Sequence, residues 1–61
     1  MQMTTEDCLK KAILDTQEKV RDFMNYSDLI EDAQISAYFR KCAELEGRQA
    51  HNFQVFLDRR V

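Results

Sequence analysis

Apolar and small residues recur every three or four positions through the first half of the chain. They are Leu9, Ile13, Thr16, Val20, Phe23 and Ser27. Because this spacing brings side chains to one side of an α-helix, it predicts a helix over about residues 5–27. Thr4 or Thr5 can cap this helix, and the negative charges of Glu6 and Asp7 suit its N-terminal end.

A second and more apolar stripe occupies the rest of the chain. Its members are Ile35, Tyr38, Phe39, Cys42, Leu45, Gln49, Phe53, Phe56 and Leu57. At about 100° per residue they fall within an arc of roughly 100°, which predicts a helix over about residues 32–59. Asp32 is the preferred N-cap, with Asp28 as the alternative, so residues 28–31 form the expected connection.

Two helices of similar length joined by a short connection predict an all-α fold, an antiparallel two-helix hairpin forming one domain over residues 1–61. The 61 residues include one glycine and no proline, a composition that suits long helices. A single hairpin has only one helix–helix interface and rarely holds together alone in water. We therefore expect two hairpins to dimerise into a four-helix bundle.

The expected dimer interface draws on large apolar residues of both stripes. These residues are Ile13, Val20, Phe23, Phe39, Leu45, Phe53 and Phe56. A homodimer or a higher homo-oligomer would cover them. A further hypothesis is that an unidentified helical protein covers the stripe instead, in which case the isolated chain would bind hydrophobic dyes.

Charge and hydropathy narrow the choice of partners. The net charge is −2, and no basic stripe of the kind that neutralises phosphates is present, so nucleic acid is not an expected partner. No apolar run is long enough to cross a membrane, and residues 1–5 lack the features of a signal peptide, so we expect a cytoplasmic protein without a membrane partner. In that compartment Cys8 and Cys42 would be free thiols.

Polar side chains interrupt both stripes near their middle. Glu46 and Gln49 fall inside the apolar arc of the second helix, and Thr16 and Gln17 lie roughly level with them on the first. A buried carboxylate needs a hydrogen-bond partner, a proton, a metal or water. We expect these four residues to form a polar layer across the bundle core, which can fix the register and the oligomeric state.

Residues 39–49, Phe-Arg-Lys-Cys-Ala-Glu-Leu-Glu-Gly-Arg-Gln, resemble the second helix of a rubrerythrin-type ferritin-like half-bundle. That family has Phe, then Ala-Glu-x-Glu and, after two more residues, His; the last Glu and the His bind metal. Glu46 stands at the position of that Glu. The resemblance implies a metal site between protomers, built from Glu46 with Glu44 or Gln49. A weaker overall similarity is to small uncharacterised two-helix proteins of spore-forming bacteria, from which no activity can be carried over.

The sequence also departs from the family's ligand pattern. Gln49 replaces the His, and an amide is a poorer ligand for iron or zinc than imidazole. Ile13 or Thr16 stands where the family has its upstream Glu, and His51 falls on the outer face of the second helix. We therefore expect no bound metal, no cofactor and no enzymatic activity. The leading hypothesis is a self-associating structural or interaction module, and the alternative is a ferritin-like metal-binding protein with a site around Glu46 between protomers.

Overall fold

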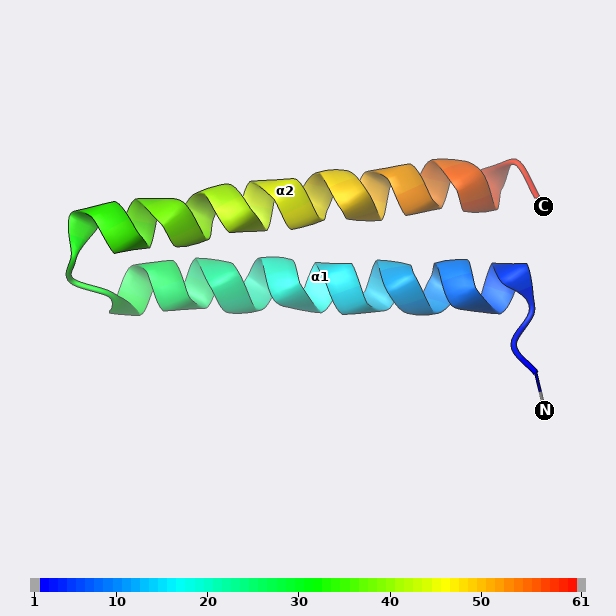
Figure 1. Cartoon of the computed structure of the whole chain (residues 1–61), viewed down its shortest axis with the longest axis horizontal. Coiled ribbons are helices and arrows are strands. Elements are labelled where there is room, and N and C mark those ends of the chain that lie inside the picture. The colour runs from blue at the N-terminus through cyan, green and yellow to red at the C-terminus, as the bar shows by residue number, and fades with distance from the viewer. Residues whose placement is uncertain (1, 61) are drawn as a thin grey trace.

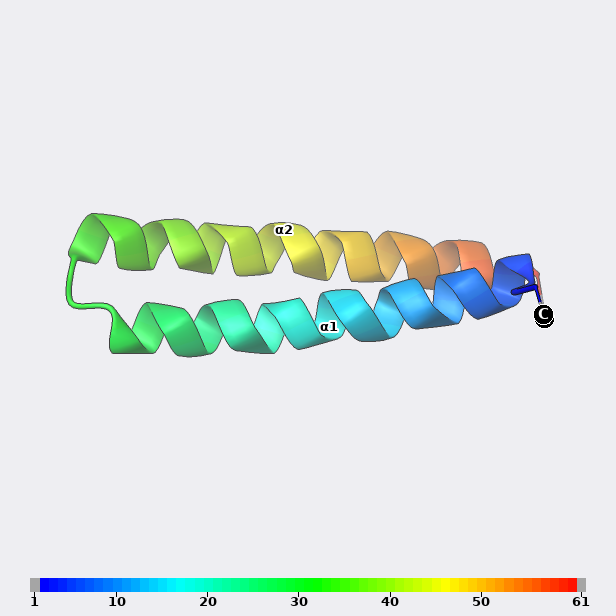
Figure 2. The same ribbon diagram turned by 60° about the horizontal axis from the view of Figure 1, so that its bottom comes forward.

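The computed structural model describes residues 2–60, which form two long helices and no strand. Helix α1 spans Thr5–Leu29 and helix α2 spans Ala33–Asp58. The helices run antiparallel and lie side by side along their whole length, with one tight connection (Figures 1 and 2). The prediction of an all-α two-helix hairpin is confirmed.

Side chains define where each helix begins. Thr4 is the N-cap of α1: its hydroxyl accepts the backbone N–H of Asp7 at 3.0 Å, and the Asp7 carboxylate accepts the N–H of Thr4 at 3.2 Å. Asp32 is the N-cap of α2, as the sequence predicts, because one carboxylate oxygen accepts the N–H groups of Gln34 and Ile35 at 2.9 and 3.1 Å. These bonds satisfy donors that have no partner within the helix.

Helix α1 continues two residues beyond its predicted end. The predicted helix ends at Ser27, and serine favours turns. In the structure its hydroxyl donates to the carbonyl of Met24 at 2.7 Å, one turn back, so the side chain is satisfied inside the helix. The connection is thus shorter than predicted, and it contains Ile30, Glu31 and the capping Asp32.

Three contacts fix the register of the two helices. Near the turn, the Ser36 hydroxyl donates to the carbonyl of Ser27 at 2.7 Å. One turn further along, the rings of Phe23 and Phe39 lie 5.9 Å apart. At the open end, Arg60 forms an ion pair with Glu6 in the first turn of α1. Residues nearer the start of α1 therefore lie beside residues nearer the end of α2.

The seam between the helices is made by buried and half-buried residues spaced three and four apart. On α1 they are Glu6, Leu9, Ile13, Thr16, Val20, Phe23 and Ser27, and on α2 they are Ser36, Phe39, Ala43, Glu46, Ala50, Phe53 and Leu57. The predicted α1 stripe agrees with this seam. On α2 the seam instead centres on Ala43, which is only 4% exposed, because small residues let the two helices approach closely.

The hairpin is a single flat layer. Its backbone extends over 44 × 23 × 10 Å, so nearly every residue lies close to one of two broad faces. Among residues 2–60 no large side chain is completely buried. The seam therefore joins two helices without enclosing a core of the kind that a larger domain has.

Candidate functional site: an exposed apolar face

Two rows of side chains border the seam on one broad face. On α2, Ile35, Cys42, Gln49 and Phe56 are spaced seven residues apart, so they line up along the helix. On α1, Thr5, Ala12, Lys19 and Tyr26 do the same. Thr5 and Phe56 line one shallow depression, which places both rows on the same face.

Several large side chains on this face are apolar and exposed. We call it the apolar face, and it comprises Tyr26, Leu29, Ile35, Tyr38, Cys42, Leu45 and Phe56. Leu45 and Phe56 expose 48% and 50% of their surface, and Tyr38 exposes 67%. Scattered exposed apolar residues are normal, but several gathered on one face are typical of an interaction site.

The apolar arc predicted for α2 is thus divided between two roles. Phe39, Phe53 and Leu57 pack in the seam, whereas Ile35, Tyr38 and Leu45 point away from α1. The arc is wider than one neighbouring helix can cover. Seam residues and exposed residues of α2 both recur every seven positions, so this spacing does not distinguish the two roles, and the position of α1 does.

Helix α1 brings charged side chains to the edge of the apolar face. Lys19 is exposed in the row described above, and Asp15 lies one turn away on the same helix. Asp15 is also held by Lys11, whose ammonium lies 2.8 and 3.0 Å from its two carboxylate oxygens. This carboxylate raises the pKa of Lys11 through the hydrogen bonds and the charge that it presents.

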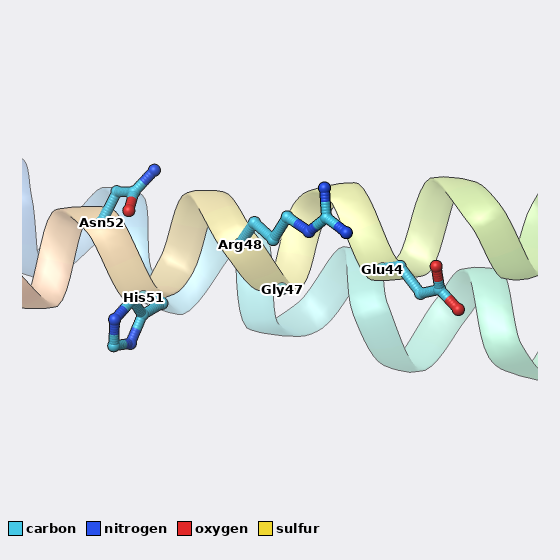
Figure 3. Close-up of a pocket in the computed structure, with 5 residues that line it drawn as sticks. All are labelled: Glu44, Gly47, Arg48, His51 and Asn52. Carbon is cyan, nitrogen blue, oxygen red and sulfur yellow. The ribbon is translucent and has the colours of Figure 1, made fainter.

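The opposite face is mostly polar, although Leu14 and Met24 are exposed there. Gln17 lies there beside Gly47, His51 and Gln54, around an open depression. Figure 3 shows a second shallow area nearby, lined by Glu44, Gly47, Arg48, His51 and Asn52. His51 and Asn52 point away from Glu44, and no hydrogen bond links these side chains. We call this surface the polar face.

The four residues of the predicted polar layer occupy three different environments. Thr16 is buried in the seam, and its hydroxyl lies 2.9 and 3.0 Å from the carbonyls of Ala12 and Ile13 in its own helix. Glu46 is half-buried in the seam. Gln17 is exposed on the polar face and Gln49 on the apolar face. No hydrogen bond among the described residues joins the four side chains.

Glu46 has an oxygen without a hydrogen-bond partner. Its Oε2 is buried, and no donor within residues 2–60 reaches it. The register of the helices places Glu46 level with Thr16, but the Thr16 hydroxyl already donates within α1. A buried oxygen of this kind costs free energy unless a further group binds it.

The predicted dimer interface is likewise distributed. Five of its members, Ile13, Val20, Phe23, Phe39 and Phe53, are buried or half-buried in the seam of a single chain. The other two, Leu45 and Phe56, lie on the apolar face. In a four-helix bundle, seam residues and face residues together would form one core.

Within one chain, residues 2–60 hold no group of three or more His, Cys, Asp and Glu side chains close enough to bind a metal ion. Glu46 therefore has no set of ligands in its own hairpin, and the candidates Glu44 and Gln49 both lie on exposed positions. Both cysteines are free, Cys8 exposed and Cys42 half-buried.

The sequence matches no protein-family model, and comparisons with characterised proteins and with solved structures find no match either. Neither helix within residues 2–60 combines the length and the apolar character needed to span a bilayer.

Proposed function

We propose that the protein is a self-associating helical module, in which two hairpins pack through their apolar faces to form a four-helix bundle with a structural or interaction role. The observation that carries this proposal is the position of Ile35, Tyr38, Leu45 and Phe56, which are exposed together on one face. A second hairpin laid on this face would cover them and create a closed core.

The exposed area supports the same proposal. The hairpin exposes 5012 Å². A compact monomer of 7.3 kDa would expose about 4,200 Å², so the hairpin exposes roughly 800 Å² more. A standard protein–protein interface buries about 800 Å² on each partner. The excess is therefore of the size that one dimer interface would remove.

Substitution of Leu45 by glutamate tests the proposal. Leu45→Glu would place a charge in the interface, so we expect sedimentation equilibrium or light scattering to give the mass of a dimer for the parent chain and of a monomer for the variant. The matched control is Leu14→Glu, because Leu14 is 64% exposed but lies outside the apolar face. A parent chain that is monomeric and folded would refute self-association, and dye binding by that monomer would favour a different helical partner.

The unpartnered oxygen of Glu46 favours a second candidate, a ferritin-like metal-binding protein whose site forms between protomers. Two copies of Glu46, with Glu44 or Gln49, would supply oxygen ligands to a hard cation. Elemental analysis of protein purified without chelator tests this candidate. Bound metal that disappears in Glu46→Gln would support it. Absence of metal, together with a melting temperature unchanged by added iron or manganese, would refute it.

A further inference from the structure

From the arrangement of side chains on the apolar face we infer how the second copy docks: with its connection at the opposite end, so that α2 packs on α2 and α1 on α1. This inference rests on the proposed self-association and adds its geometry. The twofold axis would lie between the two apolar faces, parallel to them and at right angles to the helices, and it would pass near Leu45. The argument comes from the positions of apolar and charged residues relative to the middle of the hairpin.

The members of the α2 row lie at equal distances on either side of the middle of that helix. Helix α2 runs from Ala33 to Asp58, so its midpoint falls between Leu45 and Glu46. A twofold axis at this level would bring Ile35 of one copy next to Phe56 of the other, and Leu45 next to its own counterpart. The two α2 rows would thus cover each other from end to end, with Cys42 of each copy next to Gln49 of the other.

On α1, a negative and a positive side chain lie at equal distances on either side of the middle of the helix. Helix α1 is centred on Gln17, which is level with the midpoint of α2. The same axis would bring Lys19 of each copy opposite Asp15 of the other, which makes two ion pairs between the copies. A carboxylate has room for several donors, so Asp15 can keep its bond to Lys11 while it accepts another.

The other twofold arrangement, with both connections at the same end, is less favourable. It would lay α2 of each copy on α1 of the other. Cys42 and Leu45 would then face the charged stretch that contains Asp15, Lys19 and Asp22. These groups would lose water without gaining partners of opposite charge. Separation of apolar from charged contacts therefore favours the arrangement with opposite ends.

The inferred dimer has two equivalent ends. Each end would carry the connection of one copy beside Thr5 and Asp58 of the other, and the ends would be separated by about the 44 Å length of the hairpin. A partner that recognises the connection would thus meet two identical sites at opposite ends of a rigid spacer. With both connections at one end, the two sites would instead lie side by side.

Distance measurements between spin labels distinguish the arrangements. Glu31 in the connection and Asp58 at the end of α2 are exposed and lie off the apolar face. Each would be replaced by cysteine and labelled with a nitroxide in a Cys8→Ser, Cys42→Ala background whose dimeric mass has been verified. We expect pulsed electron–electron double resonance to give distances near 44 Å between two labels at position 31 and between two labels at position 58. A mixture of the two labelled chains should add a distance of about 20 Å, because packed helices lie 8–10 Å apart.

The outcomes separate the inference from the proposed function. Short Glu31–Glu31 and Asp58–Asp58 distances with no short distance in the mixture would overturn the docking geometry but leave self-association standing. A monomeric mass for the parent chain, with no distance between labels, would overturn both. Long Glu31–Glu31 and Asp58–Asp58 distances, together with a short Glu31–Asp58 distance in the mixture, would support both.

Discussion

Arg60 and Glu6 are 54 residues apart in the sequence, yet the Arg60 Nε donates to the Glu6 Oε1 at 2.6 Å. The bond joins the last residues of the hairpin to the first turn of α1 and so closes the end opposite the connection. Hydrogen bonding to the guanidinium lowers the pKa of Glu6 below its ordinary value of 4.5. The pair therefore couples the closure of this end to pH.

The first prediction concerns that coupling. Because the pKa of Glu6 is lower in the folded chain than in the unfolded chain, the pair stabilises the fold fully above the ordinary value of 4.5 and loses this effect as the pH falls through the lowered value. Glu6→Gln should lower the urea midpoint at pH 7 by a small amount and leave it unchanged near pH 2, at fixed protein concentration. The control is Glu44→Gln, which removes an exposed carboxylate without this partner. Equal midpoints for parent and Glu6→Gln at pH 7 would contradict the prediction.

The N-cap of α2 gives a second prediction. Asp32 accepts two backbone N–H groups, so Asp32→Ala should lower the free energy of unfolding by about 1 kcal/mol in urea titrations. The control is Asp28→Ala, because within residues 2–60 the Asp28 side chain makes only one ion pair, an exposed one to Arg40 at 3.4 Å. Its effect should be below about 0.5 kcal/mol. A larger loss for Asp28→Ala than for Asp32→Ala would mean that the cap lies elsewhere.

Gly47 gives a third prediction. A Cβ added at this position would meet nothing within 4 Å. Gly47→Ala should therefore raise the free energy of unfolding by about 1 kcal/mol, since glycine is less favourable than alanine inside a helix. Because Gly47 borders the polar face, the mass of the proposed dimer should not change. Ala37→Gly, at an exposed position of the same helix, should cause a loss of similar size. Dissociation of the dimer by Gly47→Ala would show instead that the polar face is the interface.

Glu46 gives a fourth prediction, which applies if the buried oxygen has no ligand. Glu46→Met should then raise the free energy of unfolding by about 1 kcal/mol, because it removes an unpartnered acceptor and adds apolar contacts in the seam. Glu44→Met, at an exposed position nearby, should have little effect. Thermal unfolding monitored by circular dichroism would measure both. A clear loss of stability in Glu46→Met would indicate that a second copy or a cation binds this carboxylate.

Much of the hairpin can be predicted from local patterns. Asp32 is recognisable as an N-cap because its chemistry acts on the two or three residues that follow it. The α1 seam is recognisable because Ile13 and Val20 belong to a stripe narrow enough for one neighbouring helix. The ion pair between Glu6 and Arg60 could not be predicted, since it depends on the exact length of the connection and on the register of two helices.

The sequence by itself determines that two amphipathic helices form and that they fold back on each other, because helix periodicity and capping depend on near neighbours. Only the tertiary structure decides which part of the α2 arc faces α1. Close approach is easiest at Ala43, so the seam centres there, and Leu45 and Phe56 remain on the open face. That choice creates the surface on which the proposed function depends, and it results from contacts between residues that are distant in sequence.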